Sequence, residues 1–274
     1  CENSVVLIGH TTGSHLNLSD LVEFHTEGVI WLARVQQKKI SFWQIIADTQ
    51  ENFGGLRLEN YHMIFVPELY AATIAKHLDL LPHGTRTHDV SDVRKYYSRE
   101  YQNAAPEEIL QLGEKLLFDE GYRFVSYELI HDHPGAVDAL SPDRVMGLGK
   151  NIDDWFSVDS YAQFIAGPAW KKGILRDEHI DSWIASDNLW WRCAAAVSTI
   201  YLGGDVERML RYTAQLLGDR EDMVIIALSW VLRSAIVHDR NAVMQFLVQH
   251  EDRLADQIKH EVRNKLATGL NILE

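Results

Sequence analysis

The sequence predicts a mostly α-helical protein: an α-solenoid of helix pairs, preceded by a short N-terminal segment that contains a β-hairpin. From Met63 onward, apolar residues recur at helical spacing in segments of about 10 to 17 residues. Short turns rich in Gly, Pro and Asp separate these segments. Because no segment is long enough for a coiled coil, we expect antiparallel helices that pack in successive pairs.

The first 58 residues carry the pattern of strands. Apolar, mostly β-branched and aromatic residues dominate 5–8, 29–35 and 40–46, and a polar run separates the last two segments, which predicts a β-hairpin. The run GVIWLARVQQKKISFWQIIADT resembles the last strands of a SnoaL-like α+β domain. Since the earlier elements of that fold are missing, we expect an incomplete fragment without an active site over residues 1–62. The helical domain is expected over residues 63–274.

Punctuating residues predict where individual helices begin and end. Pro106, followed by two glutamates, predicts a helix that starts after Ala105. Asn188, at the end of a Ser-Asp-Asn run, is expected to cap the helix that follows it. Turns between helices are predicted at residues 82–84, 133–135, 203–204 and 218–219.

Charge limits the kinds of partner that the protein can bind. The formal net charge of −13 argues against a protein that coats nucleic acid nonspecifically, because phosphate contacts need clustered Lys and Arg. The acid is unevenly distributed, with 12 basic and 21 acidic residues in 63–188 but 10 and 11 in 189–274. A stripe of basic residues that contacts phosphates is therefore possible on the helices of 189–274.

Several other classes of protein do not fit the sequence. No apolar run is long enough to span a membrane, and the opening CENSVVLIGH lacks the pattern of a secretory signal, so we expect a cytoplasmic protein. Cys1 and Cys193 have no zinc-ligand spacing, and residues 131–133 (His-Asp-His) precede Pro-Gly, as at the end of a helix. We expect a monomer without metal or cofactor.

Trp155 and Asp159 are four residues apart, so on a helix they share a face and can address one ligand. The alternative makes Trp155 the first residue of a core stripe that continues through Val158, Ala162 and Ile165, with Asp159 solvated beside it. Spacing alone favours this alternative.

The segment 222–237 predicts a second informative helix. Trp230 lies about 160° around the helix from the expected core positions, and Arg233 is one turn further on nearly the same side. Trp230 therefore either faces a ligand or fills the interface with an adjacent helix pair, and the two interpretations are equally supported. The expected core positions are Ile225, Leu228, Leu232 and Ile236.

Four segments together resemble successive signatures of the AlkD-type alkylpurine DNA glycosylases, which are built from HEAT-like helix pairs. The resemblance covers roughly residues 90 to 270 and leaves the N-terminal segment outside it. The segments are DDWFSVDSYAQFIAGPAW, WIASDNLWWRCAAAVSTIYL, DREDMVIIALSWVLRSA and HEVRNKLATGL.

The resemblance implies a solenoid that wraps damaged double-stranded DNA and hydrolyses the N-glycosidic bond of cationic N3- or N7-alkylated purines, without flipping the base. Asp159, Trp155 and Trp230 match the aspartate and the two tryptophans that line the family's lesion site. The chemistry is consistent with these residue types. Indole faces attract cations, and a carboxylate stabilises the positive charge that develops on the sugar.

The chain departs from the family pattern at one position. Cys193 stands where the family has an arginine that contacts the DNA backbone, and Arg192 lies one residue early, which rotates its direction by about 100°. Cys193 is expected to be a small core residue. This departure, with the acidic charge, keeps open the alternative of a non-catalytic HEAT-repeat protein that binds DNA or a protein partner. The expected DNA contacts are Arg192, Arg233, Lys171, Lys172 and Arg263.

Overall fold

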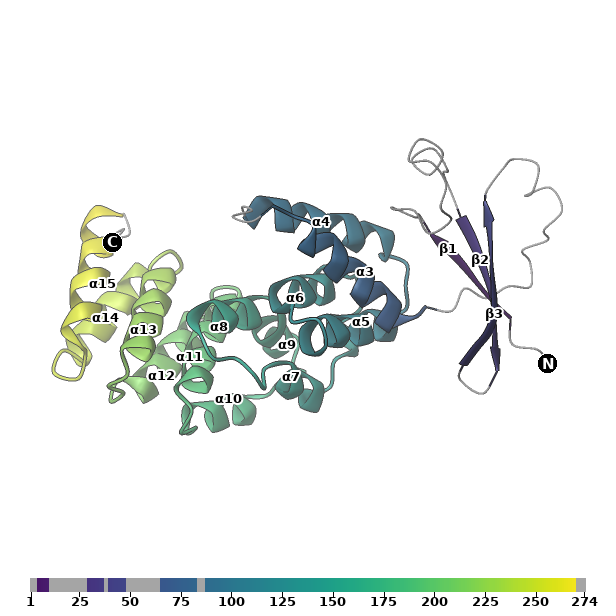
Figure 1. Cartoon of the computed structure of the whole chain (residues 1–274). Helices are drawn as coiled ribbons and strands as arrows, with labels where there is room; N and C mark the ends of the chain where they lie inside the picture. The colour runs from purple at the N-terminus through teal and green to yellow at the C-terminus, as the bar shows by residue number, and fades with distance from the viewer. Residues whose placement is uncertain (1–3, 10–28, 37–38, 48–64, 83–86, 270–274) are drawn as a thin grey trace. The chain divides into compact units, whose positions relative to one another are not determined.

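The structure, a computed structural model, describes residues 4–9, 29–36, 39–47, 65–82 and 87–269. The chain divides into two compact units, Cys1–Val66 and Pro67–Glu274 (Figure 1). This division lies a few residues after the boundary expected from the sequence.

The N-terminal unit contains a three-stranded antiparallel sheet. Strands β1 (Ser4–Gly9), β2 (Val29–Gln36) and β3 (Lys39–Ala47) lie in the order β1-β2-β3. The pairing of β2 with β3 is the predicted hairpin, with a register shift between Arg34 and Val35 that fits a β-bulge. The resemblance of this unit to the end of a SnoaL-like domain stays a prediction.

The described part of the second unit is helical, which confirms the mostly α class. Its predicted helix starts are confirmed at Pro106 and at Leu189, where the Asn188 side chain accepts from the Trp190 backbone N–H at 2.8 Å. Among the described residues, short non-α turns interrupt the α-helices at η2 (Val137–Ala139), η3 (Ala162–Ala166) and η4 (Thr199–Leu202). The α-helices are α3 (Pro67–Asp79), α4 (Thr87–Glu100), α5 (Pro106–Phe118), α6 (Arg123–Asp132), α7 (Pro142–Leu148), α8 (Trp155–Tyr161), α9 (Gly167–Lys171), α10 (Asp177–Ile184), α11 (Leu189–Ser198), α12 (Val206–Leu216), α13 (Asp222–Ala235), α14 (Arg240–Gln249) and α15 (Asp256–Thr268).

The helices pack mainly on neighbours that are close in sequence, and in Figure 1 they follow one another from α3 to α15. Helix α6 contacts α4 and α8, α11 contacts α8 and α13, and α13 contacts α15. These contacts place α8, α11, α13 and α15 as successive neighbours. Within the described residues, no helix has the length and apolar character needed to cross a bilayer.

An aromatic core joins the helices around α8. Tyr161 is fully buried, and its ring centroid lies 5.8 Å from that of Tyr127, 6.1 Å from that of Trp183 and 5.9 Å from that of Trp191. The Tyr161 hydroxyl donates to the Val145 carbonyl at 2.9 Å, so the polar end of the ring is satisfied. These contacts fix α8 against α6, α10 and α11.

Helix α8 continues through η3 into α9, and η3 is a π turn. A π turn holds one more residue than an α turn and often lies at functional sites. Directly after it, Gly167 leaves no room for a side chain, because an added Cβ would lie 2.5 Å from the Tyr201 Cβ and 2.8 Å from the Ala162 carbonyl oxygen. This close approach brings η4 against the α8–α9 segment.

Candidate functional site

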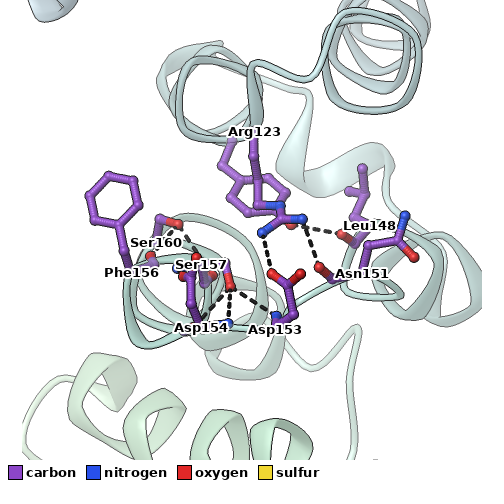
Figure 2. Close-up of polar contacts among 9 residues, drawn as sticks. Arg123, Leu148, Asn151, Asp153, Asp154, Phe156, Ser157 and Ser160 are labelled. Carbon is purple, nitrogen blue, oxygen red and sulfur yellow. Dashed lines mark hydrogen bonds and ion pairs between the residues drawn. The ribbon is translucent and has the colours of Figure 1, made fainter.

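Local hydrogen bonds fix the start of α8 (Figure 2). The Asp154 carboxylate accepts from the Ser157 backbone N–H at 2.6 Å, and the Ser157 hydroxyl oxygen accepts from the backbone N–H groups of Asp153 and Asp154 at 3.1 Å. This reciprocal capping satisfies N–H groups that have no partner in the first turn of a helix. The sequence Asp-Asp-Trp-Phe-Ser therefore sets Trp155 as the first helical residue.

Arg123, at the start of α6, anchors the loop that leads into α8. Its guanidinium donates to the Asn151 carbonyl oxygen at 2.6 Å and to the Asp153 carboxylate at 3.3 Å, as Figure 2 shows. The loop is thus tied to α6 at the same point where α8 is capped. The sequence carries no signal for this role of Arg123, because its partners are 28 and 30 residues away in the chain.

Trp155 is 60% exposed, so the alternative that makes it a core residue is wrong. The rest of the expected stripe, Val158, Ala162 and Ile165, is buried. Trp155 lies at the exposed edge of this stripe, where it contacts the neighbouring Phe156 ring edge to face at 5.9 Å. An exposed indole on a well-anchored helix is available to a ligand.

Asp159, one turn after Trp155, lies partly buried rather than solvated. Burial raises the pKa of its carboxyl group to about 6. Among the described residues its carboxyl group forms no hydrogen bond and no ion pair. A desolvated carboxylate without a compensating partner costs stability, and such groups concentrate at functional sites.

Two side chains of neighbouring elements lie within the electric field of Asp159. The Asp159 charge adds to the burial that raises the pKa of Tyr201, in η4, to about 12, and it acts in the same direction on Cys193, in α11. Asp159 therefore lies where α8, α11 and η4 meet. Tyr201 was missed because its place depends on the close approach at Gly167, for which the sequence carries no distinct signal.

Trp230 lies on the partly exposed side of α13. Leu228 and Leu232 are buried as expected, but Ile225 and Ile236 are only partly buried, and the remaining core positions are Val224, Ala227, Val231 and Ala235. Trp230 shares its side of the helix with the exposed Ile226 and with Arg233. Since α11 packs against both α8 and α13, Trp230 and the pair Trp155–Asp159 lie on helices that flank the same neighbour.

Arg192 makes contacts within the chain. Its guanidinium donates to the Asp219 carboxylate at 2.6 Å and to the carbonyl oxygens of Ser186 and Asp187 at 2.9 and 3.0 Å, and its side chain is only 15% exposed. It thereby ties the turn before α11 to the turn before α13. Cys193 is buried, as expected.

The other expected DNA contacts differ in their partners. Lys172 pairs with Asp138 at 2.5 Å, Arg263 pairs with Glu251 at 2.5 Å, and Arg233 pairs with Glu261 at 3.4 Å. Lys171 is exposed and has no ion pair among the residues that the structure describes. Most of the candidate cations thus face a carboxylate of their own chain.

In the part of the chain that the structure describes, no group of three or more His, Cys, Asp or Glu residues that could hold a metal ion converges. The residues 131–133 lie at the end of α6, as expected. His131 bonds to the Phe164 carbonyl oxygen at 3.2 Å, and His133 bonds to the Ala104 carbonyl oxygen at 3.0 Å. Both rings thus have structural partners.

A family model described as DNA alkylation repair enzyme matches residues 71–266. The match begins within α3 and ends within α15, so it includes every helix that carries a candidate site residue. A search of curated proteins gives no match. Because the family match covers more than half of the chain, the protein belongs to the family of DNA alkylation repair enzymes, which assigns it to DNA repair.

Proposed function

We propose that the protein is a DNA glycosylase that releases cationic N3- and N7-alkylpurines from double-stranded DNA, with Asp159, Trp155 and Trp230 as its catalytic residues. The observation that supports this most directly is the Asp159 carboxylate, which is desolvated, has no partner among the described residues and lies one helical turn from an exposed indole. We also infer that the helices form an α-solenoid of HEAT-like pairs, since each contacts mainly its neighbours along the chain.

The proposed reaction uses Asp159 as an electrostatic catalyst. The C–N bond between the sugar and the purine breaks, and its electron pair leaves with the purine, which thereby loses its positive charge. The sugar becomes an oxocarbenium ion, and water adds to its anomeric carbon and releases a proton. The ionised Asp159 stabilises the positive sugar, orients the water and accepts the proton.

Trp155 and Trp230 provide the binding energy for the charged base. An indole face attracts a cation by about 0.5 to 2 kcal/mol, and more when water is excluded. Trp155 offers a largely exposed ring for this contact, and Trp230 offers a partly exposed one. An undamaged purine is neutral and gains less from either ring, so the aromatic pair discriminates by charge.

The phosphate contacts are proposed to come mainly from Lys171, Lys172 and Arg263, and Arg233, whose charge Glu261 offsets, is proposed as a weaker contact. Lys171 is the simplest candidate, because its ammonium group is exposed and has no ion pair in the described residues. The Arg192 guanidinium already donates to Asp219 and to the carbonyl oxygens of Ser186 and Asp187. Arg192 is therefore proposed to contact a phosphate only through its remaining N–H groups.

A second candidate function is non-catalytic binding of DNA or of a protein partner by a member of the same family. Two observations favour it: Cys193 replaces the family arginine, and Arg192 is committed to Asp219. The net charge of −13 points the same way. DNA binding that falls steeply between low and moderate salt would separate a DNA-binding protein from a protein adaptor.

The test is the release of N7-methylguanine and N3-methyladenine from a methylated duplex. Asp159→Asn keeps the size of the side chain but removes its charge, so we expect release to fall by a factor of about 100 or more. Asp181→Asn, an exposed carboxylate in α10, is the matched control and should keep the rate of the natural protein. Equal release by the natural protein and the Asp159 variant, or none by either, would contradict the proposal.

The same assay has an expected pH dependence. Asp159 must be ionised to stabilise the sugar cation, and its pKa is raised to about 6. The rate should therefore be highest above pH 6 and fall about tenfold per pH unit below it. A rate that stays constant down to pH 4 would show that this carboxyl group takes no part in the reaction.

A further inference from the structure

Arg233 is held at one place beside Trp230 by two contacts. Its Nε donates to the Ser229 carbonyl oxygen at 3.3 Å, and its Nη2 lies 3.4 Å from the Glu261 carboxylate of α15. The two charged side chains are 17% and 15% exposed. Water screens this pair far less than the pair of Arg263 and Glu251, whose side chains are 56% and 43% exposed.

Glu261 is kept ionised by its surroundings. The Ser229 hydroxyl donates to one carboxylate oxygen at 2.5 Å, and the Gln257 amide donates to the other at 2.8 Å. Although burial alone would raise the pKa of Glu261, these two hydrogen bonds and the charges of Arg233 and His260 lower it. The carboxylate is thus fully charged at neutral pH and fixed by groups other than the arginine.

The fixed carboxylate changes what Arg233 offers to DNA. A lone arginine beside Trp230 would attract any phosphate backbone, damaged or not, and would also repel a cationic base at the indole. With Glu261 at 3.4 Å, the pair carries no net charge. The positive charge of the lesion then becomes the main electrostatic difference between a damaged and an undamaged site.

We propose that Glu261 is a specificity-determining residue of the repair site: by neutralising Arg233 next to Trp230, it keeps affinity for undamaged DNA low, so that a cationic base is favoured. This inference rests on the proposed function, because it takes the surface around Trp230 to be the one that meets DNA. The substrate class that follows is duplex DNA that carries a positively charged base, rather than DNA in general.

The test is a double-mutant cycle measured by binding to an undamaged duplex over a range of salt concentrations. Glu261→Gln keeps the side-chain size and can keep both contacts, because its amide oxygen can accept from Gln257 and its amide nitrogen can donate to the Ser229 hydroxyl oxygen. We expect this variant to bind the undamaged duplex several-fold more tightly at low salt. The slope of log affinity against log salt should steepen by up to about 0.9, the value for one additional phosphate contact.

Two controls assign the effect to Arg233. Glu207→Gln removes the same charge from an exposed position of α12 that has no ion pair among the described residues, so it measures the general effect of net charge. In the background of Arg233→Ala, Glu261→Gln should have no more effect than Glu207→Gln. Thermal unfolding checks that each variant is folded.

Three outcomes would overturn the proposal: Glu261→Gln binds no more tightly than the natural protein, its gain equals that of Glu207→Gln, or its gain persists without Arg233. Failure of the glycosylase proposal is distinguishable, because it leaves the affinities for undamaged DNA unchanged and removes only alkylpurine release. If no variant binds the duplex even at low salt, both proposals are contradicted.

Discussion

Two aspartates near Cys193 of α11 have contrasting environments. Asp219, in the turn before α13, accepts from Arg192 at 2.6 Å and from the Glu221 backbone N–H at 3.0 Å. Although burial alone would raise the pKa of Asp219, these bonds lower it. Asp159 is also desolvated but has no such donor among the described residues, and its pKa is raised to about 6.

The difference separates a carboxylate that stabilises the fold from one that is available for chemistry. Ionised Asp219 is stabilised by the partners that it holds together, so its charge contributes to folding. Ionised Asp159 makes folding less favourable, because nothing in the described structure compensates for its lost hydration. A group that costs stability in the folded protein is best explained by a function outside folding.

Arg192→Ala would give the largest effect, because it converts Asp219 into a second desolvated carboxylate without its cation. Removing one partner of a partly buried pair should lower the free energy of unfolding by about 2 to 4 kcal/mol. Chemical denaturation would measure it. Arg220→Ala, an exposed arginine without an ion pair among the described residues, is the control. A loss of less than about 1 kcal/mol in the free energy of unfolding would contradict this expectation. It would mean that the Arg192–Asp219 pair contributes little to folding, so that Arg192 would be available to contact a DNA phosphate.

The Asp219 pair also predicts an acid response. Because the folded-state pKa of Asp219 lies below the usual value of 3.8, its contribution is present above pH 4 and is lost as the pH falls through the folded-state value. The stability difference between the natural protein and Asp219→Asn should therefore shrink as the pH falls from 5 towards 2. A constant difference would contradict the pairing.

Gly167→Ala would disturb the packing of η4, which carries Tyr201, near Asp159. The new Cβ would lie 2.5 Å from the Tyr201 Cβ and 2.8 Å from the Ala162 carbonyl oxygen, so backbone must move. We expect a loss of about 1 to 3 kcal/mol in the free energy of unfolding. Gly147→Ala is the control, since nothing lies within 4 Å of its added Cβ. If η4 shifts away, the pKa of Asp159 should also fall towards 3.8, which NMR titration of the carboxyl carbon would detect.

Asp159→Asn would give the smallest change in stability and one of opposite sign. Since the pKa is raised in the folded state, the penalty is absent below pH 4 and grows as the pH rises through 6. Allowing for partial solvent screening, the variant should be more stable by about 1 kcal/mol at pH 7 and no more stable at pH 4. A less stable variant at pH 7 would point to a partner that holds Asp159 in the fold.

The sequence was sufficient for the helical class, for the strands of the hairpin, and for helix starts such as Pro106 and Leu189, because capping and periodicity are local. It was misleading at Trp155. Helical spacing places this residue in line with Val158 and Ala162, but the first residue of a helix can lie beyond the edge of the packed region.

Contacts between residues that are distant in the chain could not be predicted from the sequence. Arg192 lies 27 residues from Asp219, and Arg233 lies on a different helix from Glu261, so no spacing rule connects them. The same holds for Tyr201, which reaches the neighbourhood of Asp159 only because Gly167 lets two backbones approach. The residue types at the site could be predicted from the family resemblance, whereas their charge state could not.

The π turn at Ala162–Ala166 places one additional residue between α8 and α9. Deleting a single residue there would restore regular α-helix and leave the parts before and after the turn at nearly the same rotation about the axis, because the turn holds one residue more than an α turn. Trp155 and Asp159 would then keep their directions while Gly167 stayed in contact with η4. A one-residue deletion in this turn should therefore be tolerated better than the same deletion inside α13, where it would rotate one part of the helix by about 100° relative to the other.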